Sequence, residues 1–197
     1  MQCFCGNLMK KRIINKMDFF ECPNCSYLKK ANKLSASDEK KRYDMHKCDE
    51  GYRKYMNNVY KMVSQYLKDG RSLDYGCGQI HLLSDILNAN NRICDYYDLY
   101  YYNEYPNNKY DNIILIEVFE HIDDIYELLE RLRKDLNDNG RIIIMTKPIV
   151  EDLEHWWYLR DETHISFVNA NTFSVLANML GMKLMVDNSS SIFVLEA

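Results

Sequence analysis

The chain contains 197 residues, 47% of them hydrophobic, and carries a formal net charge of −4. This composition is typical of a globular protein, and the length suits one sizeable core with a small appendage, not two full domains. No apolar run approaches the ~18–20 residues needed to span a bilayer, so we expect no membrane segment.

The number of cysteines and the first residues of the sequence indicate the cellular compartment in which the protein resides. The sequence starts Met1-Gln2-Cys3, without the charged and then apolar pattern of a signal peptide. It contains seven cysteines, an odd number, which favours a reducing environment. We therefore expect a cytoplasmic protein.

Residues 1–33 are predicted to form a small metal-binding head. Their two cysteine pairs are Cys3 with Cys5 and Cys22 with Cys25. Two close pairs joined by a loop can converge on one tetrahedral Zn²⁺ ion, with each thiolate about 2.3 Å from the metal. Short strands on either side of Asn15-Lys16 would form a hairpin, and the metal would supply folding energy that so small a segment lacks. We predict a zinc ribbon with a structural ion; the alternatives are a redox pair or buried thiols.

Charge divides the chain unevenly. Residues 1–47 carry 11 Lys and Arg against 5 Asp and Glu, a net charge of +6; residues 48–197 carry 14 against 24, a net charge of −10. The basic segment is either a solvated face or a surface that contacts RNA. The acidic remainder suits a cationic ligand and argues against a broad nucleic-acid footprint.

Residues 34–68 are predicted to be N-terminal helices that cover part of a large domain, residues 34–197. A helical stretch from Tyr52 to Leu67 follows the segment Tyr43-Asp44-Met45-His46. An N-terminal helix in a βαβ fold packs over the edge of the ligand site. Tyr43 and His46 are therefore candidate lid residues that contact a cofactor.

The glycine-punctuated segment Leu73-Asp74-Tyr75-Gly76-Cys77-Gly78 comes next. Strand-like residues lead into it, and its glycines permit a tight turn and the close approach of a ligand. Residues 80–87 then carry apolar side chains at helical spacing, so the order is that of a nucleotide-binding βαβ unit. Asp74 would repel a pyrophosphate and favours a cationic ligand with an amino group. An ordinary strand-to-helix turn is the alternative.

A second predicted strand, residues 93–97, ends at a carboxylate. Asp98 lies 20 residues after Gly78, where nucleoside sites place an acid that accepts hydrogen bonds from both ribose hydroxyls. Asp95 takes this role instead if the strand ends early.

Two apolar runs, residues 110–117 and 141–146, are typical of strands buried on both faces. The helix between them is capped by Asp123 or Asp124 and ends at Asn139-Gly140. Its apolar stripe consists of Ile125, Leu128, Leu129, Leu132 and Leu136.

A helix over residues 171–180 and two strands, 182–186 and 192–195, complete the chain. Strand and helix therefore alternate from residue 71 to residue 181, and a hairpin follows. This order predicts an α/β fold: a doubly wound, Rossmann-like sheet with an antiparallel last strand.

The motifs resemble class I S-adenosylmethionine-dependent methyltransferases over roughly residues 43–197, and in particular a bacterial subfamily that bears a zinc ribbon. Asp74-Tyr75-Gly76-Cys77-Gly78 is similar to the first motif of the class. The other recurring blocks are Gly51-Tyr52-Arg53, Tyr97-Asp98, Glu117 to His121, Met145-Thr146-Lys147 and Arg160 to Phe167. The resemblance implies that Asp74, Gly76 and Gly78 hold the methionine end of the cofactor, and that Glu117 and Val118 lie near its sulfonium.

Glu117, Glu120 and His121 fall where the 110–117 strand ends, at the edge where ligands of open α/β sheets bind. Similar clusters occur in small-RNA 2′-O-methyltransferases, where a later histidine completes a divalent-ion site; His164 is the corresponding residue. A metal here would lower the pKa of an acceptor hydroxyl. The alternative, in which no metal binds, is the one that the sequence favours. Glu120 then caps a turn, and His121 or His164 is a general base.

Two functions from different classes follow. The first is an enzyme that moves a methyl group from S-adenosylmethionine to a hydroxyl or amine of an unidentified small molecule, with His121, His164 and Glu120 as catalytic residues. The second is a zinc-headed RNA-binding module or an rRNA-type methyltransferase. The acidic large domain favours the first.

Overall fold

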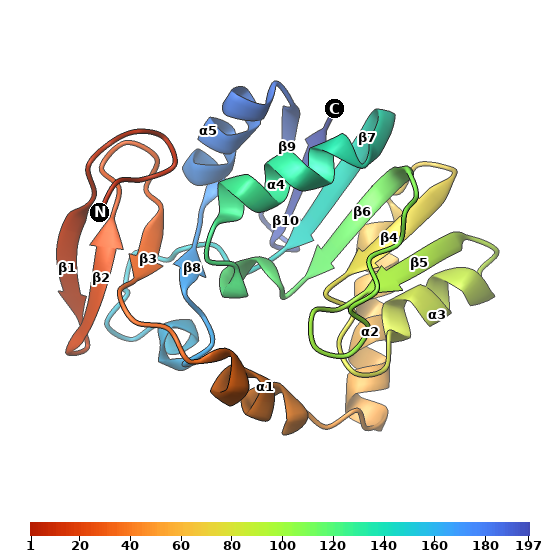
Figure 1. Cartoon of the computed structure of the whole chain (residues 1–197), viewed down its shortest axis with the longest axis horizontal. Coiled ribbons are helices and arrows are strands. Elements are labelled where there is room, and N and C mark those ends of the chain that lie inside the picture. Colours follow the sequence, from red (N-terminus) through yellow and green to blue (C-terminus); the bar gives the residue numbers. More distant parts are fainter.

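The computed structural model describes residues 1–197 and is built on a six-stranded sheet (Figure 1). In spatial order its strands are β5 (Ile93–Tyr97), β4 (Arg71–Tyr75), β6 (Tyr110–Ile116), β7 (Leu136–Met145), β10 (Ile192–Glu196) and β9 (Lys183–Asp187). The first four are parallel, and β10 runs antiparallel to both β7 and β9. The predicted Rossmann-like sheet with an antiparallel last strand is confirmed.

Helices cover both faces of this sheet. They are α4 (Ile125–Lys134) and α5 (Ala170–Leu180) on one face, and α2 (Glu50–Ser64) and α3 (Leu82–Ala89) on the other (Figure 1). Successive side chains of a strand point to opposite faces. In β7, accordingly, Ile142 and Ile144 join the core under α4 and α5, whereas Ile143 and Met145 join the core under α2 and α3. Burial on both faces explains why these strands are continuous apolar runs.

The predicted boundaries of two helices need correction. The helix that follows β6 ends at Lys134, not at Asn139-Gly140, and β7 begins at Leu136, not at residue 141. Leu136 continues the apolar spacing of the helix, but its backbone pairs with Tyr110 of β6. The helix after the glycine turn begins at Leu82, two residues later than expected, because His81 adopts a left-handed conformation with φ 35°.

A second, smaller sheet contains the N-terminal residues. It consists of β1 (Lys10–Ile14), β2 (Met17–Glu21), β3 (Leu28–Lys30) and β8 (Ser166–Phe167), in that order. The predicted hairpin is present: Asn15 and Lys16 connect β1 to β2 with φ values of 49° and 64°, which suits a tight turn. The fourth strand was not predicted, because it comes from the far end of the sequence.

The head and the large domain share one hydrophobic core. Cys3, Cys25 and Tyr27 belong to the same buried cluster as Leu129 of α4 and Phe173 of α5. Polar contacts also cross between them: the Tyr27 hydroxyl lies 2.7 Å from the Ser166 Oγ, and the Lys29 Nζ lies 2.6 Å from a carboxylate oxygen of Asp123. The division into residues 1–33 and 34–197 remains a prediction, but the two parts pack together closely.

Three short helices complete the fold: α1 (Ala36–Asp44), η1 (Phe119–His121) and η2 (Trp157–Arg160). They lie near the carboxyl ends of the parallel strands, where α1 bridges the region between the head and α2 (Figure 1). Among all the helices, none combines the length and the apolar character that crossing a membrane requires.

Candidate active site

The glycine turn after β4 combines one crowded position with one open position. Gly76 has φ 78°, and a Cβ there would lie 2.4 Å from a methyl carbon of Val118. Gly78 has φ 70°, and a Cβ there would meet no atom within 4 Å. The first glycine therefore lets the ends of β4 and β6 meet, and the second borders free space that a ligand can occupy.

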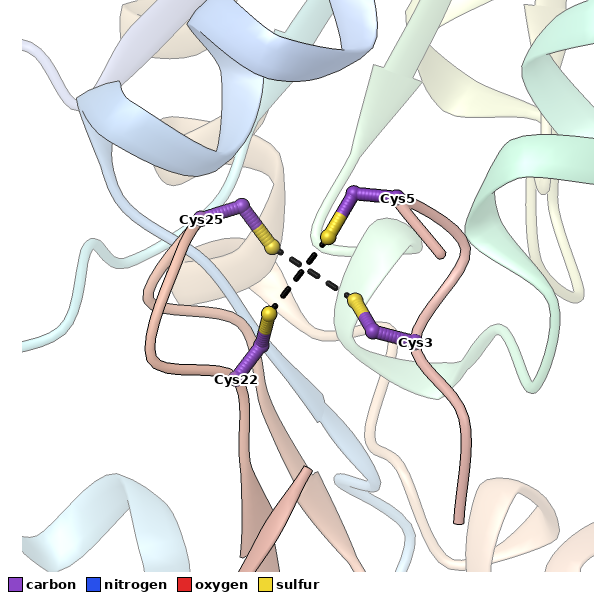
Figure 2. A group of neighbouring side chains, drawn as sticks. All are labelled: Cys3, Cys5, Cys22 and Cys25. Atoms are coloured by element: carbon purple, nitrogen blue, oxygen red, sulfur yellow. Dashed lines mark hydrogen bonds between the residues drawn. The ribbon is translucent and has the colours of Figure 1, made fainter. Parts of the chain in front are cut away.

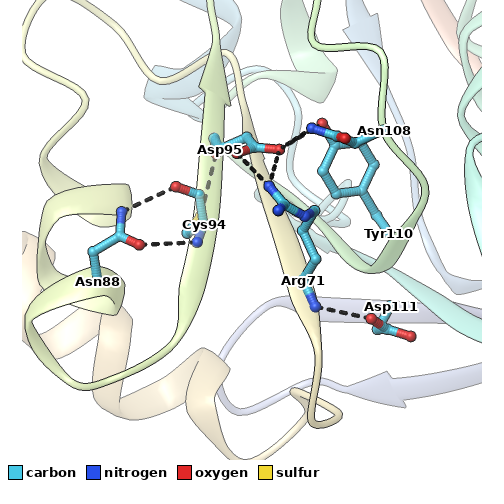
Figure 3. Close-up of polar contacts among 7 residues, drawn as sticks. All are labelled: Arg71, Asn88, Cys94, Asp95, Asn108, Tyr110 and Asp111. Atoms are coloured by element: carbon cyan, nitrogen blue, oxygen red, sulfur yellow. Dashed lines mark hydrogen bonds and ion pairs between the residues drawn. The ribbon is translucent and has the colours of Figure 1, made fainter.

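Asp98 lies beside this turn. One of its carboxylate oxygens accepts the backbone N–H of Gly78 at 3.0 Å, and the other accepts the N–H groups of Tyr100 and Tyr101 at 2.8 and 3.2 Å. Asp95, the competing candidate, is engaged elsewhere (Figure 3): it pairs with Arg71 at 2.9 Å and accepts hydrogen bonds from Asn108 and Tyr110. Of the two acids, only Asp98 contacts the turn.

Asp74 is buried beneath the turn, with 3% of its surface exposed. Its carboxylate accepts the backbone N–H of Ser84 at 3.2 Å in the first turn of α3. Burial raises the pKa of this carboxyl to about 7. The side chain supports the strand-to-helix junction, and its predicted contact with a cofactor stays a prediction.

Helix α1 contacts residues of the site, and its predicted role as a lid stays a prediction. The Tyr43 ring packs edge-on against His121, with 5.4 Å between ring centroids, and its backbone carbonyl accepts a hydrogen bond from Gln79 at 2.8 Å. The Tyr100 hydroxyl donates to Glu39 of the same helix at 2.6 Å. His46 is exposed, 6.0 Å from the Tyr43 ring. Of the two predicted lid residues, Tyr43 makes the closer contact with the site.

Two acids meet where β6 ends. Glu117 has a left-handed backbone, φ 51°, a strained conformation of the kind that concentrates at functional sites. Glu120 is fully buried; it accepts hydrogen bonds from the Tyr158 hydroxyl and, at 3.0 Å, from the Thr146 hydroxyl. The Tyr158 hydroxyl also lies 3.3 Å from Glu117. Burial and mutual repulsion raise the pKa of Glu117 to about 7, and burial raises the pKa of Glu120.

The two predicted histidines come together, with 4.9 Å between their ring centroids. The Nδ1 of His121 lies 3.1 Å from the carbonyl oxygen of Thr163, and the Nδ1 of His164 lies 2.9 Å from that of Tyr158. Because a carbonyl oxygen only accepts, these contacts assign the ring proton to Nδ1 and leave the Nε2 lone pair free. Burial lowers the pKa of both rings, that of His164 to about 4.

The low pKa of His164 makes a testable contribution to stability. Its folded-state value of about 4 is below the unfolded value, so the unfolded chain binds the proton first as the pH falls. This contribution is complete above pH ~6.5 and is lost as the pH falls to ~4. We expect that lowering the pH from 7 to 4.5 reduces the free energy of unfolding of His164→Gln by about 2–3 kcal/mol less than that of the wild type. Urea unfolding at the two pH values measures this difference. Equal losses of unfolding free energy in the two proteins would contradict the low pKa of His164. Acids such as Asp74 titrate in both proteins, so their contributions cancel in the comparison.

Ligand atoms of Glu120, His121 and His164 all lie within 4.8 Å of one another. Carbonyl oxygens hold both imidazoles through Nδ1, an arrangement typical of metal-binding histidines. One carboxylate with two such imidazoles is a donor set that fits a divalent ion. His164, predicted as the fourth ligand, lies in this group together with Glu120 and His121. Glu117, the remaining member of the predicted set, is outside the group and interacts with Glu120 and with the Tyr158 hydroxyl beside it.

Thr146 and Tyr158 are site residues whose contacts the sequence did not predict. Tyr158 follows two tryptophans: Trp156 belongs to a buried cluster with Phe167, while Trp157 is 61% exposed. Thr146 directly follows β7, at the same sheet edge as Glu120, and that position was the available signal.

The four cysteines of the head converge on one point (Figure 2). The Sγ atoms of Cys3 and Cys25 are 3.5 Å apart, as are those of Cys5 and Cys22, and all four lie within 4.8 Å of one another. A tetrahedron with 2.3 Å metal–sulfur bonds has edges of about 3.8 Å, so the cluster is close to the size that Zn²⁺ requires. A hydrogen bond from Cys25 lowers the pKa of the Cys3 thiol to about 5, which favours the thiolate form.

Comparison with known proteins identifies the family of the chain. A family described as a methyltransferase domain matches residues 34–185. The chain therefore belongs to the methyltransferase-domain family, and the predicted enzyme class, a class I S-adenosylmethionine-dependent methyltransferase, is confirmed. A search of curated proteins finds no significant match.

Solved structures share the fold at low sequence identity. A SAM-dependent methyltransferase from Archaeoglobus fulgidus is 14% identical, with a TM-score of 0.56 over 74% of this chain and 94% of its own. The plantazolicin methyltransferase BamL, in complex with a triazolic desmethylPZN analog and SAH, is 17% identical (TM-score 0.52; 79% and 76% covered). An O-methyltransferase family protein from Burkholderia thailandensis is 8% identical (TM-score 0.52; 80% and 61% covered).

Proposed function

We propose that the protein transfers a methyl group from S-adenosylmethionine to a hydroxyl or amine of a small-molecule acceptor. The observation that carries this proposal is the free Nε2 of His121 and of His164 at the sheet edge that also holds Gly78 and Asp98. The cofactor supplies an activated methyl group. The protein then needs to align the acceptor and assist the loss of its proton. In the metal-free alternative either neutral imidazole accepts that proton at Nε2, whereas with the divalent ion proposed below both Nε2 atoms are ligands and the ion activates the hydroxyl.

In this proposal the cofactor lies against the glycine turn. Gly76 and Gly78 border its methionine end, Asp98 accepts its ribose hydroxyls, and Glu117 and Val118 lie near its sulfonium. The open space at Gly78 and the position of Asp98 support these roles. Tyr43 closes the site from α1. The structural neighbour bound to a triazolic analog and SAH supports a small acceptor, whose identity the proposal leaves open.

Replacing Asp98 with alanine tests the cofactor site. We expect the affinity for S-adenosylhomocysteine to fall by about 2 kcal/mol, roughly 30-fold in Kd, because hydrogen bonds to a charged acceptor are lost. Isothermal titration calorimetry measures the change. Asp95→Ala is the matched control, since Asp95 is bound to Arg71 away from the turn. A Kd unchanged in Asp98→Ala and raised in Asp95→Ala would move the ribose site to Asp95.

We also propose a divalent ion at Glu120, His121 and His164, in place of the metal-free alternative. Their mutual distances and the carbonyl-held imidazoles support this ion. It would lower the pKa of an acceptor hydroxyl beside the transferred methyl group.

For the head, we propose a structural Zn²⁺ ion bound by Cys3, Cys5, Cys22 and Cys25. Four thiolates leave no open coordination position for catalysis. The spacing of the sulfur atoms supports this ion, and with it a place in the zinc-ribbon-bearing subfamily and a zinc-ribbon head over residues 1–33.

No specific observation favours the RNA alternative. Ion pairs with Asp or Glu engage six of the 11 cations in residues 1–47: Lys11, Arg12, Lys29, Lys33, Lys40 and Lys41. A paired cation contributes less to phosphate binding than a free one, since part of its charge is already neutralised. The solvated-face interpretation of this segment is the better supported one.

A further inference from the structure

The Tyr158 side chain is held in place independently of the active-site acids. It lies in η2 with 2% of its surface exposed, inside a cluster that includes Trp156 and Phe167. Its ring centroid is 5.2 Å from that of Trp156 and 6.3 Å from that of Phe167. The ring can therefore act as a rigid support for the groups that its polar atoms contact.

The hydroxyl of Tyr158 points into the meeting point of the two acids. It donates to Glu120 and also lies 3.3 Å from Glu117 and 3.4 Å from the Thr146 hydroxyl. Thr146 donates to the second carboxylate oxygen of Glu120. Both oxygens of Glu120 thus accept a hydrogen bond from a hydroxyl group, and these two hydroxyls fix the orientation of the buried carboxylate.

The main chain of the same tyrosine fixes the imidazole. The carbonyl oxygen of Tyr158 accepts the Nδ1 proton of His164 at 2.9 Å, and the two rings pack with 4.1 Å between centroids. One residue therefore contacts both Glu120 and His164, which come from different segments of the chain. Partners that orient metal ligands in this way typically change metal affinity when they are removed.

We propose that Tyr158 is a positioning residue that fixes Glu120 relative to His164 at the divalent-ion site. The inference rests on the proposed function, because it requires these residues to bind the ion. It goes further because it names the groups that orient two of the ligands: the Tyr158 hydroxyl orients the Glu120 carboxylate, and the Tyr158 carbonyl orients the His164 ring. Tyr158 itself is not a ligand in this arrangement.

Manganese binding to the full chain tests the proposal without knowledge of the acceptor. The head is first loaded with a single equivalent of Zn²⁺, which the four thiolates bind ahead of the Glu120, His121 and His164 site, and unbound Zn²⁺ is removed. Mn²⁺ is then titrated by electron paramagnetic resonance, since Mn²⁺ prefers oxygen and nitrogen ligands over thiolates. Tyr158→Phe keeps the ring and the backbone carbonyl and removes only the hydroxyl. We expect it to weaken Mn²⁺ binding by about 10- to 100-fold. Thr146→Val, which removes the other donor to Glu120, should weaken binding in the same direction.

Tyr110→Phe is the matched control. Tyr110 is a buried tyrosine whose hydroxyl donates to Asp95 at 3.1 Å, in the network drawn in Figure 3. This variant loses a phenol–carboxylate hydrogen bond of the same kind outside the site, so its Mn²⁺ affinity should stay within about twofold of the wild type. A melting curve of each variant reports stability separately from metal affinity.

Wild-type Mn²⁺ affinity in Tyr158→Phe would overturn the proposal whatever Thr146→Val does, as would an equal loss in Tyr110→Phe. Absence of Mn²⁺ binding to the wild-type chain would overturn it together with the proposed divalent ion. Calorimetry with S-adenosylhomocysteine distinguishes that result from failure of the proposed function: bound cofactor product with no bound Mn²⁺ removes the metal and Tyr158 inferences and leaves methyl transfer standing.

Discussion

Replacing Cys25 with serine is expected to lower the melting temperature of the whole chain by about 10 °C or more, in a single transition. Loss of a structural zinc ligand costs several kcal/mol, and 1 kcal/mol shifts the melting temperature by about 2–4 °C in a chain of this size. The effect should spread because Cys25 is fully buried in the same core as α4 and α5. Its backbone carbonyl also accepts a hydrogen bond from Thr172 of α5 at 2.9 Å.

Calorimetry with circular dichroism at two wavelengths measures this effect, and a chelator should reproduce it in the wild type. Cys48→Ser is the control, since Cys48 is only partly buried and lies outside the cysteine cluster. The sequence alone predicts a different result, in which residues 1–33 unfold and the large domain stays folded. Should the large domain of Cys25→Ser melt at the wild-type temperature, the head is an independent unit and the shared core contributes little.

The active site should respond to zinc loss as well. Strand β3 of the head pairs with β8, whose Ser166 hydroxyl donates to the carbonyl of Ile122. The neighbouring Ile165 N–H donates to the carbonyl of Glu120 at 2.8 Å. His164 is the next residue along the chain. The head is therefore connected through β8 to the loop that carries His164, a link that no local sequence pattern indicates.

The central sheet could be predicted because its signals are local. Apolar runs such as residues 110–116 are long enough to distinguish a strand buried on both faces, and Gly181 ends α5 in the left-handed conformation that favours glycine. The end of α4 was misplaced because Leu136 satisfies both the helical spacing and a strand position. Only the pairing of Leu136 with Tyr110 decides between them, and that pairing is a tertiary contact.

The candidate site was predicted in part for the same reason. His121 and Glu120 follow a recognisable strand, and His164 lies in a loop after the next one, so topology brings them to one edge. The choice between Asp95 and Asp98 depended on where β5 ends, which the alternation of its residues did not fix. The role of Tyr158 depends on the direction of one hydroxyl and one carbonyl group, which sequence spacing does not encode.

Replacing His164 with alanine is expected to abolish Mn²⁺ binding at the proposed ion site and to leave the affinity for S-adenosylhomocysteine unchanged. The imidazole supplies one of three candidate ligands, and Glu120 with His121 alone should bind the ion at least 100-fold more weakly. Cofactor binding should survive, because none of the contacts that His164 makes involves the glycine turn or Asp98. Paramagnetic resonance measures the first affinity and calorimetry the second.

His155→Ala is the control for this experiment. His155 is exposed and pairs only with Asp152, so its loss removes an imidazole without touching the site. Two results would contradict the proposed arrangement. Mn²⁺ binding that persists in His164→Ala would show that the ion binds elsewhere. Cofactor affinity that falls while Mn²⁺ binding survives would place His164 at the cofactor and remove it from the ion site.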